Sequence, residues 1–143
     1  MDLINKILLT IVAVGGGVLP IMVDFSETHL LNENWSSHAR THVAWLLATN
    51  FLTSMLSLYF LWGKNLKLIP ILFISSIIAG YFISILTKDS YGGSISEIGG
   101  VEDKIYGIEA GMFFFSSLLI ILISAIVSIT FTEKIQQNSM FNK

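Results

Sequence analysis

The sequence contains no cysteine and very little charge. Of its 143 residues, 13% are charged, whereas a soluble domain has about 25%. The absence of cysteine excludes disulfides, thiolate metal sites and cysteine nucleophiles. The net charge of −2 and the lack of a basic run provide no electrostatic surface for nucleic acid, so no nucleic-acid partner is expected. Seven of the eight basic residues are lysine, a bias that indicates an A/T-rich, bacterial genome.

Long hydrophobic runs are abundant instead. Hydrophobic residues make up 53% of the chain, and its mean hydropathy is +0.73. They form stretches at residues 4–23, 42–62, 66–87 and 108–132, each about as long as the 20 residues with which a helix crosses a bilayer. Because lipid cannot satisfy open backbone groups, such runs form helices. The sequence predicts an all-α, polytopic membrane protein, an antiparallel four-helix transmembrane bundle in one domain over residues 1–143.

The first stretch has a second interpretation as a cleaved signal peptide. Lys6 would form its basic region, and the small residues at 13–17 its cleavage region. Against this, the apolar run continues through Pro20 to Val23 and contains no A-x-A site. We expect a span whose outer half is weakened or kinked by the glycines at 15–17 and by Pro20.

Lysine and arginine indicate the orientation. The N-terminal end, the turn at residues 63–65 and the C-terminal tail share one side, and the loops at 24–41 and 88–107 share the other. The side richer in basic residues is cytoplasmic by the positive-inside rule. It has five lysines against three basic residues: Lys6, Lys64, Lys67, Lys134 and Lys143 against Arg40, Lys88 and Lys104. We expect a multi-pass protein of the bacterial inner membrane with both termini in the cytoplasm.

The first outer loop and the start of the second span concentrate the residues that carry chemistry. They hold all three histidines, the only arginine and two of the three tryptophans: His29, His38, His42, Arg40, Trp35 and Trp45. If the second helix begins near Ser36 or Ser37, His38 and His42 lie at i and i+4 on one face. That spacing lets two imidazoles meet one ligand. It also suits a metal ion if a third ligand joins them, for which the candidates are Asp24, Glu27, His29 and Glu109.

The same residues have a purely structural interpretation. Trp35 and Trp45 suit the aromatic belt at a membrane surface, and Arg40 can extend to lipid headgroups. The two histidines can cap the helix and bond loop carbonyls. We assign no metal ligand and leave the cofactor open.

The second outer loop leads to Glu109. Glycine pairs at 92–93 and 99–100 indicate turns, with a short hairpin around residues 94–98. Glu109 then begins the fourth span, at the level of His42, where a carboxylate needs a partner such as His42 or Arg40. It also suits the first turn of a helix, where the macrodipole favours negative charge.

Two polar features lie deeper in the spans. Asn50 lies near the middle of the second span, where it can bond a neighbouring helix or line a cavity. Ser76, Gly80 and Ser84 form a ridge of small residues on the third span that predicts close helix contact. The candidate catalytic residues are therefore His38, His42 and Glu109, and the candidate ligand-binding residues are Asp24, Glu27, His29, Trp35, Arg40 and Asn50.

The segment before the second span resembles a known group. Small four-helix membrane proteins carry an N-x-x-W-x-x-H-A-R-x-H-like stretch at this place, matched here by Asn32, Trp35, His38, Ala39, Arg40 and His42. In architecture alone, the chain is similar to DoxX-like proteins and to the sterol-isomerase (EXPERA) group. The EXPERA resemblance implies acidic residues and histidine in a four-helix cavity that binds or isomerises sterol-like ligands.

Three functions are compatible with these features. The first is binding or conversion of a small lipophilic molecule at a polar site on the outer mouth of the bundle; whether this is enzymatic stays open. The second is a non-catalytic accessory or structural subunit of a membrane complex. The third is a small transporter acting as an oligomer, which four spans alone do not favour. The expected partners are the lipid bilayer, a lipophilic ligand and further copies of the chain.

Overall fold

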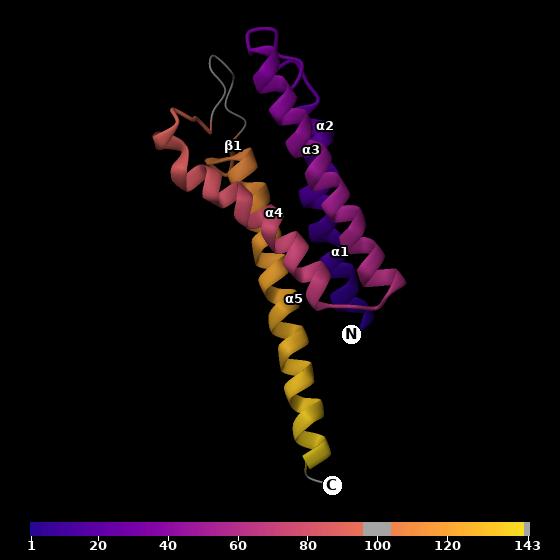
Figure 1. The fold of residues 1–143 in the computed structure, drawn as a ribbon. Coiled ribbons are helices and arrows are strands. Elements are labelled where there is room, and N and C mark those ends of the chain that lie inside the picture. Colours follow the sequence, from indigo (N-terminus) through magenta and orange to yellow (C-terminus); the bar gives the residue numbers. More distant parts are fainter. Residues whose placement is uncertain (96–103, 142–143) are drawn as a thin grey trace.

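The computed structural model describes residues 1–95 and 104–141. Within these ranges, four helices are long and apolar enough to cross a membrane: Leu3–Asp24, Ser37–Gly63, Leu68–Ser90 and Ala110–Met140. They pack as an all-α bundle (Figure 1). The prediction of four long apolar helices is confirmed, and their length and composition support membrane spans. The hairpin predicted at residues 94–98 lies mostly outside the described residues.

The first span is two helices in succession. Helix α1 (Leu3–Gly17) begins at Asp2, whose side chain accepts a hydrogen bond from the Asn5 backbone N–H at 2.8 Å. Helix α2 (Leu19–Asp24) follows directly after Val18. Pro20 has no backbone N–H with which to continue the α1 hydrogen-bond ladder. The helix is therefore interrupted one residue after the predicted glycines.

The second span begins with a serine cap and ends in a π turn. Helix α3 (Ser37–Leu58) is capped by Ser36, whose hydroxyl accepts from the Ala39 N–H at 3.1 Å. The π turn η1 (Tyr59–Gly63) continues it, with the Lys64 N–H bonded to the Tyr59 carbonyl. Within this turn, the Trp62 indole N–H donates to the Thr10 hydroxyl of α1 at 2.9 Å.

A short hairpin lies between the third and fourth spans along the chain. Helix α4 (Leu68–Thr87) ends in a 3₁₀ turn, η2 (Lys88–Ser90). Strands β1 (Lys104–Ile105) and β2 (Ile108–Glu109) pair antiparallel. The two residues between them, Tyr106 and Gly107, have φ of 54° and 81°, which is typical of a tight type I′ hairpin. Helix α5 (Ala110–Phe141) starts directly after β2 and has 32 residues, longer than the predicted span.

Helix α1 is central and packs against α3, α4 and α5. Helix α3 and its continuation η1 run antiparallel to α1. Thr10 of α1 meets Trp62 of η1, while Gly17 of α1 meets Ser54 of α3. Helix α5 also runs antiparallel to α1, because Asn5 bonds Ser128 while Gly15 approaches Leu118. At Gly17, a Cβ would lie 1.9 Å from the Ser54 hydroxyl oxygen. The absence of a side chain at this position therefore allows α1 and α3 to touch.

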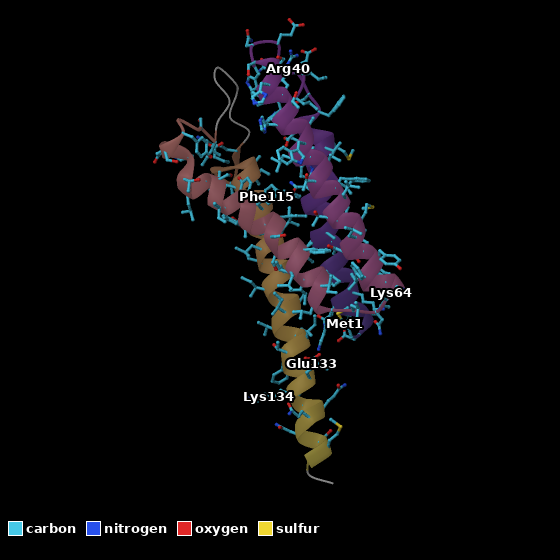
Figure 2. The ribbon with its side chains drawn as sticks, viewed as in Figure 1. Met1, Arg40, Lys64, Phe115, Glu133 and Lys134 are labelled. Carbon is cyan, nitrogen blue, oxygen red and sulfur yellow. The ribbon has the colours of Figure 1, made fainter. Side chains whose placement is uncertain are left out.

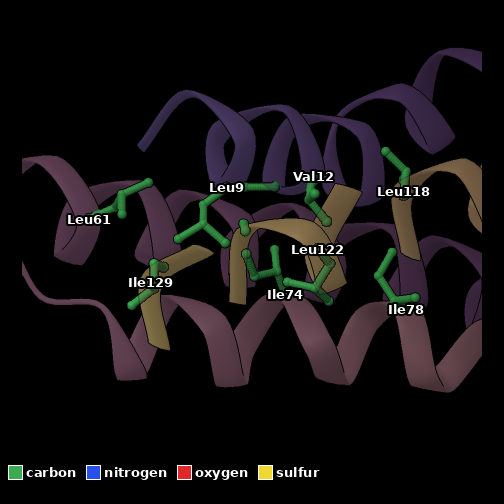
Figure 3. Close-up of a cluster of buried hydrophobic side chains, with 10 residues drawn as sticks. Leu9, Val12, Leu61, Ile74, Ile78, Leu118, Leu122 and Ile129 are labelled. Carbon is green, nitrogen blue, oxygen red and sulfur yellow. The ribbon is translucent and has the colours of Figure 1, made fainter. Parts of the chain in front are cut away.

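The core lies between α1, η1, α4 and α5. It consists of Leu9, Val12, Leu61, Ile74, Ile78, Leu118, Leu122 and Ile129, with two alanines (Figure 3). Large apolar side chains also cover the outside of the bundle, among them Trp45 at 67% and Leu86 at 83% exposure. An apolar outer surface on long helices is what a lipid-facing protein requires. The structure therefore supports a multi-pass membrane protein.

The small-residue ridge of α4 does not form the predicted helix contact. Ser76, Gly80 and Ser84 are all exposed, and nothing lies within 4 Å of a Cβ built on Gly80. The close contacts are made instead by glycines of α1. The reason is that α4 turns a different face, which carries Ile74 and Ile78, toward the core.

Candidate functional site

His38 and His42 form a pair on the first two turns of α3. Their Nε2 atoms lie 3.0 Å apart, and their rings meet edge to face with centroids 4.5 Å apart. Ser36 sets this geometry, because its cap starts the helix early enough to place both residues on the same face. Both side chains are exposed. Two imidazoles in hydrogen-bond contact can hold one proton between them and exchange it with a ligand.

The pair continues into an apolar stripe along the same helix face. A shallow, open hollow of about 350 Å³ on the outer surface of α3 is lined by His42, Trp45, Leu46 and Thr49, and the His42 and Trp45 ring centroids are 5.9 Å apart. These positions are spaced i, i+3, i+4 and i+7, so they form one stripe of the helix surface. The polar pair of His38 and His42 at the start of α3 therefore lies next to the aromatic and aliphatic side chains of Trp45 and Leu46.

Asp24 and His29 form a separate group at the end of the first span. The His29 Nε2 lies 3.8 Å from an Asp24 carboxylate oxygen, and its Nδ1 lies 2.8 Å from the Thr28 hydroxyl. The Trp35 ring meets the His29 ring edge-on, with centroids 6.2 Å apart. These contacts hold the loop between α2 and α3 together. The structure therefore brings Asp24, His29 and Trp35 into one cluster that is distinct from the His38–His42 pair.

Arg40, Glu27 and Asn50 do not join either group. Arg40 stands at the end of the bundle (Figure 2), but i and i+2 positions do not face each other on a helix, so it points away from both histidines. Glu27 is exposed in the loop. Asn50 lies about two helical turns beyond His42, where its backbone carbonyl approaches Gly17 of α1. Asn50 therefore belongs to the contact between α1 and α3.

Glu109 does not meet the histidine pair. It ends β2, opposite Lys104, rather than starting a helix, because the Tyr106–Gly107 turn folds the chain back just before α5. Among the described residues, His42 contacts His38 and Trp45, and Arg40 forms no ion pair, so the predicted pairing of Glu109 with either is not formed. The hairpin lies beside the start of α5, apart from the start of α3 (Figure 1).

The start of α5, next to Glu109, packs against an aromatic ring of α4. In α4, the ring of Tyr81 stacks on that of Phe115 of α5, with centroids 3.9 Å apart. The Tyr81 hydroxyl comes within 3.2 Å of a Cβ built on Gly111, two residues after Glu109. This stack joins α4 to α5 at the end of the bundle that carries the hairpin.

The metal hypothesis needs a third ligand beside the pair. Across residues 1–95 and 104–141, no group of three or more His, Cys, Asp or Glu side chains is placed to hold an ion. The candidate third ligands lie elsewhere, with Asp24 and His29 in their own cluster and Glu109 in β2.

Comparison with known proteins finds no matching family model, no matching curated protein and no matching solved structure. The candidate site therefore rests on the geometry of α3. Leu46 and Thr49 line this site beside His42 and Trp45, but they were not among the predicted site residues. The signal for them was present, because both follow His42 at helical spacing.

Proposed function

We propose that the protein binds a small lipophilic molecule at the start of α3, with its polar end on His38 and His42. The observation that carries this proposal is the continuity of the histidine pair with the open hollow along Trp45, Leu46 and Thr49. The hollow is open on the outer surface of α3, because all four of its lining residues are exposed. Polar groups at one end and apolar lining at the other suit an amphiphilic or lipophilic ligand.

The histidine pair supplies the polar chemistry. Each ring uses Nε2 in the contact with the other, which leaves each Nδ1 without a partner among the described residues. A ligand hydroxyl or carbonyl can bond there, and a shared proton can move between ring nitrogens and ligand atoms. The arrangement therefore suits binding, and also proton transfer of the kind that isomerisation requires. The predicted similarity to sterol-binding four-helix proteins is in keeping with this ligand class.

We also infer that both chain termini face the cytoplasm of a bacterial cell and that the histidine pair opens at the outer side of the inner membrane. The excess of lysine at the end that holds Lys6, Lys64 and Lys67 supports this orientation. A lipophilic ligand would then reach Trp45 and Leu46 from the outer leaflet, because both side chains are exposed on the outside of α3.

Native mass spectrometry of the protein purified from its membranes in mild detergent tests the proposal. We expect a retained small molecule that is lost in His42→Ala and in Thr49→Leu, which fills the hollow. His29→Ala is the matched control, because His29 lies in the Asp24 cluster, and it should keep the retained mass. Equal retention in His42→Ala, Thr49→Leu and the wild type, with all three folded by circular dichroism, would overturn the proposal.

A second candidate function is that of an accessory subunit. Residues 130–140 of α5 are all exposed, and the helix projects beyond the other three at its C-terminal end (Figure 1). An exposed helix of this kind can pack against a neighbouring subunit. In-cell cross-linking from a photoreactive residue at Ile135 distinguishes the two functions: a discrete cross-linked partner supports the subunit role, and only lipid adducts oppose it.

A further inference from the structure

Two lysines at the end of the bundle opposite the histidine pair are held by aromatic rings. The Lys6 ammonium of α1 lies 5.1 Å from the centroid of the Trp62 ring, and the Lys64 ammonium lies 5.7 Å from the centroid of the Tyr59 ring. A cation within about 6 Å of an aromatic face is attracted by the quadrupole of the ring. Both rings belong to the turn η1, so both ammonium groups are held at this one turn.

The Trp62 ring is itself fixed to α1. Its indole N–H donates to the Thr10 hydroxyl at 2.9 Å, and that hydroxyl donates to the Lys6 carbonyl at 2.8 Å. Trp62 is therefore linked to the backbone of Lys6 through Thr10, and it meets the ammonium of the same residue with its ring. These contacts order the Lys6 side chain in advance, so less conformational entropy is lost when a ligand binds.

Neither of these lysines is neutralised by a carboxylate of the described residues. The two acidic side chains at this end have other partners. Asp2 accepts two hydrogen bonds at the start of α1, and Glu133 is paired with Lys67. Across residues 1–95 and 104–141, no ion pair involves Lys6 or Lys64. An anion can therefore meet both ammonium groups without displacing an ion pair.

The position of the two rings along the chain places them at the level of lipid headgroups. Tyr59 and Trp62 lie at the end of the second apolar span, Ser37–Gly63, and are 52% and 47% exposed. Tyrosine and tryptophan at the end of a span occupy the boundary between hydrocarbon and water. Lysines at this boundary extend their ammonium groups toward the headgroups, where the phosphates of the lipids lie.

We propose that Lys6 and Lys64 bind the phosphate of an anionic phospholipid at η1. Each ammonium has three N–H donors, so it can donate to a phosphate oxygen while it stays on its ring. The exposed rings of Tyr59 and Trp62 then contact the part of the lipid next to the phosphate. A zwitterionic lipid binds less well, because it carries a cation of its own that the two ammonium groups repel.

Phosphatidylglycerol and phosphatidylcholine with identical acyl chains give the decisive comparison. The protein is placed in nanodiscs of equal parts of the two lipids and released for native mass spectrometry. Each lysine should contribute about fivefold to the retention of the anionic lipid, or about 25-fold together. Lys6→Gln and Lys64→Gln should each lower the excess about fivefold. Equal retention of the two lipids by the wild type overturns the proposal, whichever way the chain is oriented, because both leaflets have the same composition.

Lys134→Gln is the matched control for charge. Figure 2 shows Lys134 on the part of α5 that projects past Met1 and Lys64, and its side chain is exposed. The substitution removes the same charge as Lys64→Gln but leaves both lysines at η1 in place, so it should leave the excess unchanged. If Lys134→Gln lowers the excess as much as Lys64→Gln does, the attraction comes from the overall charge and the proposal fails.

Substitutions at Tyr59 test the part played by the ring. Tyr59→Leu removes the ring and keeps both lysines, and it should lower the excess to the level of Lys64→Gln. Tyr59→Phe keeps the ring and should keep the excess. Circular dichroism checks that both variants retain their helices. An excess in Tyr59→Leu equal to that of the wild type shows that the lipid is bound elsewhere and overturns the assignment to η1.

Inorganic phosphate separates a lipid from a free anion. In nanodiscs of phosphatidylcholine alone, inorganic phosphate is added at millimolar concentration and the melting temperature is measured. No rise, together with the excess of phosphatidylglycerol, supports the lipid site. A rise in the wild type that is lost in Lys6→Gln assigns the two lysines to a free phosphate and overturns the lipid assignment.

Discussion

His38 and His42 face each other across one turn of α3, with their Nε2 atoms 3.0 Å apart. One of these nitrogens must carry a hydrogen and the other must offer a lone pair. When both rings are neutral, the acceptor ring therefore keeps its hydrogen on Nδ1, and the two histidines are in different tautomers. Because both residues belong to one helix, this relationship requires no contact between α3 and another helix.

The tautomers can be measured directly. Long-range ¹H–¹⁵N spectra of histidine-labelled protein at a pH where imidazole is neutral should show one Nδ1–H ring in addition to the Nε2–H rings. In His38→Ala, the partner of His42 is gone, and the signal that reports the shared hydrogen bond should disappear. Two Nε2–H tautomers for this pair in the wild type would contradict the geometry.

The contact of α1 with α3 predicts a large effect at Gly17. A Cβ there would meet the Ser54 side chain and come within 2.8 Å of the Asn50 carbonyl. Gly17→Ala should therefore reduce the free energy of unfolding by about 1 to 3 kcal/mol, as overpacked sites do, measured by SDS titration.

Gly80→Ala is the matched control, because it lies in a helix with nothing within 4 Å of its Cβ. It should leave the free energy of unfolding unchanged or raise it by up to about 1 kcal/mol through helix propensity. Ser54→Gly should restore part of the stability in the Gly17→Ala background. Equal effects of the two alanines would show that the helices are not in contact at Gly17.

Asn5 and Ser128 should be energetically coupled. Their side chains are bonded at 3.1 Å although 123 positions separate them. A double-mutant cycle with Asn5→Ala and Ser128→Ala should give a coupling of about 0.6 to 1.7 kcal/mol, the range for hydrogen bonds between transmembrane helices. Ser124 bonds within its own helix, so the cycle of Asn5→Ala with Ser124→Ala should give none.

The orientation of the chain is testable without background labelling. Since the sequence has no cysteine, Glu27→Cys and Gln137→Cys each introduce a single thiol at an exposed position. In intact cells, a charged maleimide that cannot cross the membrane should label residue 27 and not residue 137. Permeabilised cells should show both labelled. The reverse pattern would place the histidine pair on the cytoplasmic side.

The sequence was sufficient wherever one local rule determines the structure. The four spans follow from hydrophobic length, since lipid allows few alternatives for such runs. The start of α3 follows from the cap at Ser36, and the contact of His38 with His42 follows from their spacing on that helix.

Features that depend on which helix faces pack together could not be predicted from the sequence. Glu109 was predicted to enter a helix, but a two-residue turn places it in a strand beside α5. The small residues of α4 were predicted to make a contact that Gly15 and Gly17 of α1 make instead. Periodicity identifies a face suited to packing, but it does not say which of several such faces the bundle uses.

The π turn at Tyr59–Gly63 has a consequence for the evolution of this chain. A π turn contains one residue more than an α-helical turn between bonded groups. A relative that lacks one residue here can keep the faces of the helix on both sides, with an ordinary α-helical turn between them. Its alignment with this chain would then require a gap inside a transmembrane helix, where gaps are normally penalised.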